Sequence, residues 1–270
     1  MTLSRDALGV GLRLPHYPYV FEHAPSIDYF EIISENFLGP SAIPRSRLAR
    51  IRSRYPVVLH GVGLNLLGHE PIDEAYVEAV ARLADAVDAP FVTDHLCWTR
   101  DHGRSHHDLL PAPYTRDLVE LAAERAYAVQ KKVGRPFGLE NLSSYVSFET
   151  STMTEWDFHA AVVRESGCHW LFDVNNVHVS SQNHGFDPDA YLAAVDFSRV
   201  LQVHVAGHTR EASGMLVDTH DAKVADAVRA LYVRAWKKGG PFPTMIEWDD
   251  KIPDMPELLA ELDRIRKART

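Results

Sequence analysis

The sequence predicts an α/β fold, a single (β/α)₈ TIM barrel that spans residues 1–270. Three observations favour this fold. Eight short apolar runs alternate, for the most part, with segments whose apolar residues recur at helical spacing, which is typical of parallel strands joined by helices. No linker or shift in composition divides the chain. Six of the runs end in histidine or a carboxylate, and the carboxyl ends of barrel strands share one mouth.

The strands are expected where short runs of Val, Ile, Leu and Phe are bounded by proline, glycine or polar residues. Glycines in the first run fit places where backbones approach closely. The seventh run differs from the others because it ends in two histidines. The eight predicted strands are residues 8–14, 28–33, 56–60, 91–95, 136–140, 170–173, 201–209 and 243–248.

Helices are predicted by apolar periodicity and by residues typical of helix ends. Asp73 caps a helix that stops ahead of Pro90, and Asp187 followed by Pro188 is a good start for a short helix. Residues 15–25 are expected to be irregular or briefly helical, and residues 98–108 to form a polar loop. The other predicted helices are residues 44–54, 115–133, 154–167, 222–238 and 255–267.

An open, doubly wound sheet is the alternative arrangement of these elements. Such sheets commonly bind dinucleotides through a glycine-rich turn after a strand. The segment from Gly9 to Gly11 does not continue as GxGxxG, and no other strand is followed by such a motif. The closed barrel is therefore the preferred fold.

Composition and charge exclude several classes of partner. The formal net charge is −9 and no Lys/Arg run occurs, which argues against nucleic-acid binding. No apolar stretch approaches the ~20 residues of a membrane span, and the first residues lack the apolar core of a signal peptide. We expect a cytoplasmic protein without a membrane partner. Cys97 and Cys168 form neither a disulfide framework nor a CxxC pair, so any metal must be held mainly by histidines and carboxylates.

Candidate functional residues follow from the topology, because the residues that close each run would meet at the barrel mouth. Residues in the loops after the sixth and seventh strands can reach the same mouth. The candidates are His60, His95, Glu140, Asp173, His204 and Glu247 at strand ends, with His184, Asp218 and His220 in the following loops.

Each candidate alone has an ordinary structural explanation, such as a helix cap or a loop hydrogen bond. Together, so many buried ionisable groups would repel and desolvate one another unless cations held them. Mixed imidazole and carboxylate ligands suit Fe, Mn, Zn or Co. About eight ligands are too many for one ion, so a bridging carboxylate such as Glu140 or Asp173 is expected in a multinuclear site. His178 and His208 lie near this rim, and the sequence leaves their role open.

Short motifs follow one another in a fixed order along the chain. They are His60-Gly-Val-Gly63, Asp94-His95-Leu-Cys-Trp98, His107-Asp-Leu-Leu-Pro111, Glu140-Asn-Leu142, Phe172-Asp-Val-Asn-Asn176, Asn183-His-Gly-Phe-Asp187, Gln202-Val-His-Val-Ala-Gly-His208, Asp218-Thr-His220 and Ile246-Glu-Trp-Asp249. Over roughly residues 8–265 this ordered set resembles one family, the multinuclear non-heme iron-dependent oxidative enzymes, including those of methanobactin and bufferin biosynthesis.

The resemblance implies a barrel like that of xylose isomerase, two or three irons in mixed Fe(II)/Fe(III) states, and dioxygen as co-substrate. It further implies modification of a ribosomally made precursor peptide, most often at cysteine, with a small partner protein that recruits the peptide. The catalytic residues it implies are His95, Glu140, Asp173 and His204. The implied iron ligands are His60, His95, Glu140, Asp173, His184, His204, Asp218, His220 and Glu247, with Asn141 and Asn176 as further ligands or their hydrogen-bonding neighbours.

Two other functions remain open from the residues. One is a divalent-metal enzyme with the same barrel, either a sugar isomerase or an abasic-site endonuclease, which would need no oxygen. The acidic charge counts against the endonuclease. The other is a non-catalytic peptide-binding subunit with structural metals.

Overall fold

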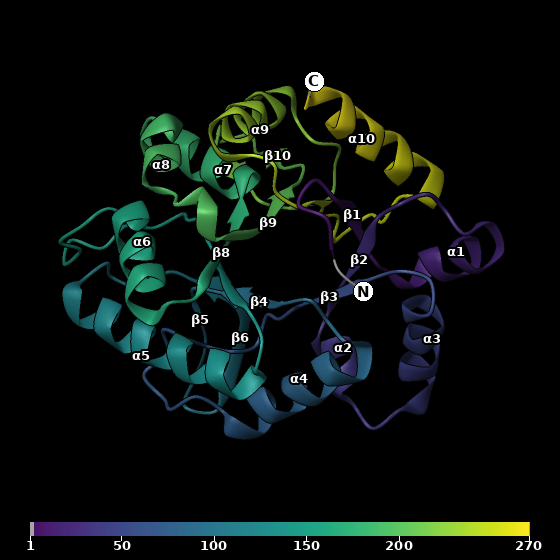
Figure 1. Ribbon diagram of the computed structural model, residues 1–270. Helices are drawn as coiled ribbons and strands as arrows, with labels where there is room; N and C mark the ends of the chain where they lie inside the picture. The colour runs from purple at the N-terminus through teal and green to yellow at the C-terminus, as the bar shows by residue number, and fades with distance from the viewer. Residues whose placement is uncertain (1–2, 270) are drawn as a thin grey trace.

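The computed structural model describes residues 3–269, apart from the side chain of His107. Eight parallel strands close into a barrel in the order β1-β12-β9-β8-β7-β4-β3-β2, and helices surround them (Figure 1). The predicted (β/α)₈ fold is confirmed. The barrel strands are β1 (Leu8–Gly11), β2 (Tyr29–Ile33), β3 (Val57–His60), β4 (Val92–His95), β7 (Phe137–Glu140), β8 (His169–Asp173), β9 (Val200–Val205) and β12 (Thr244–Ile246).

The helices begin at the side-chain caps that the sequence indicates in several places. Asp73 accepts hydrogen bonds from the backbone at the start of its helix, and Thr115 and Thr154 cap theirs in the same way. The α-helices are α1 (Tyr17–His23), α2 (Glu35–Leu38), α3 (Ala42–Arg52), α4 (Glu74–Val87), α5 (Arg116–Val133), α6 (Glu155–Ser166), α7 (Val174–His184), α8 (Pro188–Ala194), α9 (Asp226–Gly239) and α10 (Met255–Ala268), and the 3₁₀ helices are η1 (Leu14–His16) and η2 (Phe197–Arg199).

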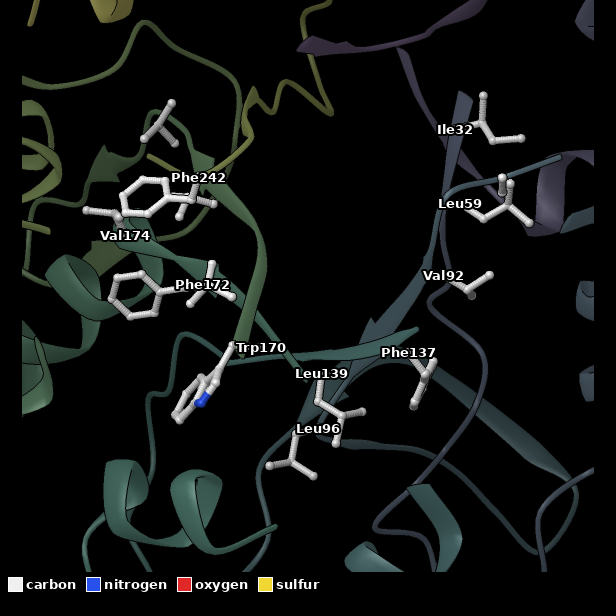
Figure 2. Close-up of a cluster of buried hydrophobic side chains, with 14 of the residues drawn as sticks. Ile32, Leu59, Val92, Leu96, Phe137, Leu139, Trp170, Phe172, Val174 and Phe242 are labelled. Carbon is white, nitrogen blue, oxygen red and sulfur yellow. The ribbon is translucent and has the colours of Figure 1, made fainter. Parts of the chain in front are cut away.

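Successive residues of a barrel strand point alternately outward, into the core beneath the helices, and inward, into the barrel interior. Phe137, Leu139, Trp170 and Phe172 belong to the large buried cluster that packs against the helices (Figure 2). The residues that alternate with them face inward. Near the start of the strands the interior is filled by a second apolar cluster, Ala7, Tyr29, Val58, Phe91 and Met245. The polar residues that end the strands therefore lie next to this apolar cluster, on the side of the barrel mouth.

Strand register sets the level along the barrel axis at which each polar residue lies. His95 pairs with Glu140 across β4 and β7, and Asp173 pairs with His204 across β8 and β9. These residues therefore lie at one level of the barrel, although they are far apart in the sequence.

Several sequence predictions are wrong, including the seventh strand, predicted at residues 201–209, which ends at Val205. Residues 98–108 are not a loop: β5 (Trp98–Asp101) and β6 (Arg104–Leu110) form an antiparallel hairpin whose turn carries positive φ angles at His102 and Gly103. The predicted helix 222–238 begins only at Asp226, after a second small hairpin of β10 (Thr209–Arg210) and β11 (Leu216–Val217). The first strand, predicted at residues 8–14, ends at Gly11; residues 12 and 13 are irregular, and a 3₁₀ helix begins at Leu14.

Helices α2 and α7 were not predicted. Helix α7 begins directly after β8 with no connecting loop, because Asp173 ends the strand and caps the helix, accepting a 2.6 Å hydrogen bond from the backbone of Asn176. Among the described residues, no helix combines the length and apolar character that crossing a bilayer requires.

Candidate metal centre

Three adjoining groups of histidines and carboxylates lie at the carboxyl ends of the barrel strands. Most of their members also line a cavity of about 510 Å³ at the mouth. Side chains of the β6 end and of the loop after β7, such as Leu109 and Tyr145, form other parts of its wall. The three groups are His60, His95 and Glu140; then Glu140, Asp173, His204 and Glu247; then His220, Glu247 and Asp249.

The first group places two imidazoles on one carboxylate oxygen. Nε2 of His60 and Nε2 of His95 each lie 3.2 Å from Oε2 of Glu140. The opposite ring nitrogens are fixed by neutral partners: Nδ1 of His60 contacts Oγ1 of Thr93 at 2.9 Å, and Nδ1 of His95 contacts the carbonyl of Gly61 at 3.1 Å. Both rings are thus oriented to present Nε2 to the same point.

The second group surrounds Nδ1 of His204. This atom lies 3.0 Å from Glu247, 3.6 Å from Oε1 of Glu140 and 4.0 Å from Asp173. All four side chains are buried. Asp173 has two roles here, because Oδ1 caps α7 while Oδ2 faces the group.

The third group lies on the other side of Glu247. Nδ1 of His220 is 3.3 Å from Glu247 and 3.0 Å from Asp249, while its Nε2 is 2.6 Å from Asp218. The guanidinium of Arg13 contacts the other oxygen of Asp249 at 2.5 Å. His220 is thus enclosed by three carboxylates.

Shared carboxylates join the groups into one centre. Glu140 belongs to the first and second groups, and Glu247 belongs to the second and third. Glu140 uses a different oxygen toward each side, Oε2 toward His95 and Oε1 toward His204. Such a carboxylate can bridge two metal ions, as multinuclear sites require.

Burial perturbs the ionisation of these groups. It raises the pKa of Glu140 to about 7, and burial together with Glu140 raises the pKa of Asp173 well above its ordinary value. Burial, with His95 and His204 nearby, lowers the pKa of His60 well below its ordinary value. Burial also acts to lower the pKa of His204, but Glu31 and Glu247 outweigh it and raise that pKa well above 6.5. Bound cations would compensate the buried carboxylates.

Buried atoms without well-formed hydrogen bonds support a fit to metal ions. Among the described side chains, several buried donor and acceptor atoms of the centre make no hydrogen bond of good geometry and face mainly other members of the centre, and such atoms are costly inside a protein. They are Nε2 of His60, Oε2 of Glu140, Oδ2 of Asp173, Oδ1 of Asn176 and Nε2 of His220. Nitrogen and carboxylate donors in this mixture suit Fe, Mn, Zn or Co, as expected from the sequence.

Asn141 and Asn176 lie directly behind the centre. The side chain of Asn141 fixes the end of β8. It donates a hydrogen bond to the carbonyl of Asp173 and accepts one from the backbone N–H of Asp173, both at 2.9 Å. Nδ2 of Asn176 donates to the carbonyl of Asn141 at 2.9 Å and lies 3.4 Å from Oε1 of Glu140. The two asparagines thus hold the strand ends that carry Glu140 and Asp173.

The structure does not bring His184 into any of the groups. His184 ends α7, is exposed, and contacts Oγ and the carbonyl of Ser144 at 2.9 Å. A helix that starts directly at Asp173 carries its last residue away from the mouth. His208 contacts Asn175 at 2.8 Å, and Asn175 donates to Asp218 at 2.5 Å, so His208 supports the third group indirectly.

Sequence reasoning missed three residues of this centre: Glu31, Asp249 and Arg13. Glu31 could have been found from strand alternation, because it lies between outward-facing Phe30 and Ile32 in β2. Asp249 ends a motif that was recognised, but only for its glutamate. No sequence signal placed Arg13 beside Asp249, since the two are joined only by closure of the barrel.

Solved structures with similar folds include sugar epimerases and a nuclease. D-psicose 3-epimerase from Clostridium cellulolyticum H10 matches with a TM-score of 0.65 and 12% identity over 97% of this chain and 99% of that chain. Endonuclease IV from Thermus thermophilus matches with a TM-score of 0.61 and 16% identity over 97% and 98%. At these identities the likeness concerns the fold, a barrel like that of xylose isomerase.

Sequence relatives are much closer. A UPF0276 protein of Rhizorhabdus wittichii is 47% identical over 98% of this chain and 95% of its own length. A UPF0276 protein of Caulobacter vibrioides is 45% identical over 98% and 95%. The family model described as RiPP precursor modification enzyme MbnB/TglH/ChrH matches residues 7–270. The chain therefore belongs to the MbnB/TglH/ChrH family of RiPP precursor modification enzymes, the multinuclear non-heme iron-dependent oxidative enzymes that its motifs resemble.

Proposed function

We propose that this protein is an iron- and dioxygen-dependent oxidative enzyme that modifies a ribosomally made precursor peptide, with cysteine as the modified residue. The observation that carries the proposal is the shared use of Glu140 and Glu247, which links three ligand groups into one buried centre. Family membership supports a peptide as the substrate. The proposed cofactor is two or three irons in mixed Fe(II)/Fe(III) states.

The proposed ligands form three positions for iron. His60, His95 and Glu140 form one position, and Asp173, His204 and Glu247 complete the next one around Glu140. Asp218 and His220 contribute to a third position beside Glu247. Iron, when bound, would supply dioxygen activation and the oxidising power, and the protein sets ligand geometry, charge and access.

The mouth suits a peptide whose reacting side chain enters from solvent. The cavity of about 510 Å³ is large enough for a side chain with adjoining backbone. Tyr145 is 43% exposed at its wall, and its hydroxyl is already held by the backbone N–H of Asp218, so the ring is fixed as a contact surface. We further propose that a small partner protein delivers the peptide to this mouth.

The test begins with metal content per chain after anaerobic purification and Mössbauer spectra of the iron-loaded protein. Cysteine-containing precursor peptides are then supplied with dioxygen, while peptide mass and oxygen consumption are followed. We expect several coupled irons per chain, oxygen uptake that depends on peptide, and a mass change at cysteine. His95→Ala is the matched inactive control, because it removes one ligand from the first position.

The alternatives give different results in the same experiment. A single zinc or manganese, with no coupled iron and no oxygen uptake, would indicate an isomerase or endonuclease. Peptide binding with iron present but no mass change would indicate a non-catalytic peptide-binding subunit. Either result would overturn the proposed function.

A further inference from the structure

Glu31 is a buried carboxylate directly behind one ligand of the centre. It lies inside the barrel on β2 and is 1% exposed. Its Oε2 lies 3.1 Å from Nε2 of His204, on the ring edge opposite to Nδ1. The side-chain amide of Gln202 donates to the same carboxylate oxygen and also lies 2.7 Å from Nε2 of His204. When Nδ1 binds a metal, Nε2 carries the proton and can donate it to Glu31, and the Gln202 amide then donates to Glu31 alone.

This arrangement distinguishes His204 from His60 and His95, the two histidines of the first group. The nitrogens that face away from the first group contact neutral atoms, the hydroxyl of Thr93 behind His60 and the carbonyl of Gly61 behind His95. His204 instead has a carboxylate behind it. A carboxylate partner increases the basicity of an imidazole ligand more than a neutral acceptor does.

The second group also carries more negative ligand charge than the first. The first group contains one carboxylate, Glu140, beside its two histidines. The second contains three, Glu140, Asp173 and Glu247, beside His204. Anionic and strongly basic ligands stabilise an ion of higher charge. Both features therefore favour the higher oxidation state at the second position and the lower one at the first.

We propose that Glu31 is a positioning residue that fixes Nδ1 of His204 toward the centre and makes the second position the site of the more oxidised iron. The inference rests on the proposed function for the identity of the metal. It goes further by assigning unequal oxidation states to particular residues. It also gives a role to a residue outside the ligand set.

A purely structural role for Glu31 is the competing explanation, since a buried ion pair can simply hold β2 against β9. The two explanations differ in what Glu31→Gln changes. Glutamine keeps the shape and can still accept from Nε2, but it removes the negative charge. Loss of that charge alters affinity and potential if Glu31 acts on the centre, whereas a carboxylate that only holds β2 against β9 changes folding stability alone.

The experiment compares wild type, Glu31→Gln and Glu31→Asp as iron-loaded proteins without peptide. Iron affinity and stoichiometry are measured by titration, and the midpoint potential by redox titration followed by Mössbauer spectroscopy. We expect Glu31→Gln to weaken iron binding about 10–100-fold, the usual effect of removing a partner behind a ligand. Its midpoint potential should shift positive, with a larger ferrous fraction, and Glu31→Asp should be intermediate.

Glu261→Gln is the matched control, because Glu261 is also a buried, ion-paired carboxylate, 2% exposed, but it pairs with Arg264 on α10. It should leave affinity and potential unchanged. If Glu31→Gln binds iron and titrates like wild type, the inference is wrong. If Glu31→Gln does not fold, the potential of Glu31→Asp decides by the same criterion.

Failure of the inference and failure of the proposed function are distinguishable. The metal readouts involve no peptide and no turnover. A potential shift in Glu31→Gln, with no peptide modified by wild type, would retain the inference and reject the function. An unshifted variant, with wild type active, would do the reverse.

Discussion

His95 and Glu140 are register partners on adjacent parallel strands, and Nε2 of His95 lies 3.2 Å from Oε2 of Glu140. They end β4 and β7, so the barrel itself sets their separation. Glu140 reaches His204 with its other oxygen, at 3.6 Å. Glu140, at the end of β7, thus connects two ligand groups.

Glu140→Ala should lose the metals of both groups that it joins, because the first group would lose its one carboxylate and the second would lose one of three, together with the bridge between them. We expect iron content to fall by two equivalents or to zero, and product formation to disappear. Elemental analysis of the purified variant measures this. Retention of the wild-type iron content would contradict the bridging role.

Phe137→Ala should affect stability and spare the centre. Phe137 begins the strand that Glu140 ends, and it is 1% exposed within the core (Figure 2). Removing a buried phenyl group costs about 3–5 kcal/mol in unfolding free energy. Denaturant unfolding of metal-free protein should show this loss, while iron per folded chain stays at the wild-type value. A loss of iron equal to that of Glu140→Ala would be the opposing result.

Gly11→Ala should weaken the third group through Arg13. A Cβ at Gly11 would lie 2.9 Å from Nη1 of Arg13 and 3.2 Å from its Cζ, so the guanidinium must move away from Asp249. We expect metal affinity at the His220 position to fall about 10-fold, near the lower end for lost partners of ligands. Metal titration separates this position from the others.

Gly39→Ala is the control for this change, since a Cβ there meets nothing within 4 Å. The control should titrate like wild type. Equal behaviour of Gly11→Ala and Gly39→Ala would show that Arg13 does not support the third group.

Acid should destabilise the protein partly through His159, which is buried and stacks on Trp170 with ring centroids 3.8 Å apart. Burial lowers the pKa of His159 to about 3, whereas the unfolded chain takes up this proton near pH 6.5. Its contribution to stability is therefore complete above pH 6.5 and is lost as the pH falls from 6.5 toward 3. The slope approaches about 1.4 kcal/mol per pH unit for one proton.

His159→Phe keeps an aromatic ring against Trp170 and removes the titration. The difference in unfolding free energy between wild type and variant should change with pH below 6.5 and be constant above it. The difference isolates His159, because all other histidines are common to both metal-free proteins. A pH-independent difference down to pH 4 would refute the effect.

Much of the fold was predictable because it depends on local patterns. Apolar runs and caps such as Asp73 and Thr154 mark strands and helix starts, and their alternation indicated the barrel. The β5–β6 hairpin was not predicted, because His102 and Gly103 form its turn within a polar, histidine-rich segment that lacks an apolar strand pattern. Helix α7 was missed because no turn separates it from β8.

The sequence by itself determined which residue types end the barrel strands, and topology then required His60, His95, Glu140 and His204 to share one mouth. Only the tertiary structure decided how they are grouped. Register placed Glu140 between two groups, and closure of β1 against β12 brought Arg13 to Asp249. Local sequence patterns indicate where each strand runs and ends. Side-chain distances across the barrel depend instead on register, closure and packing, which no short stretch of sequence contains.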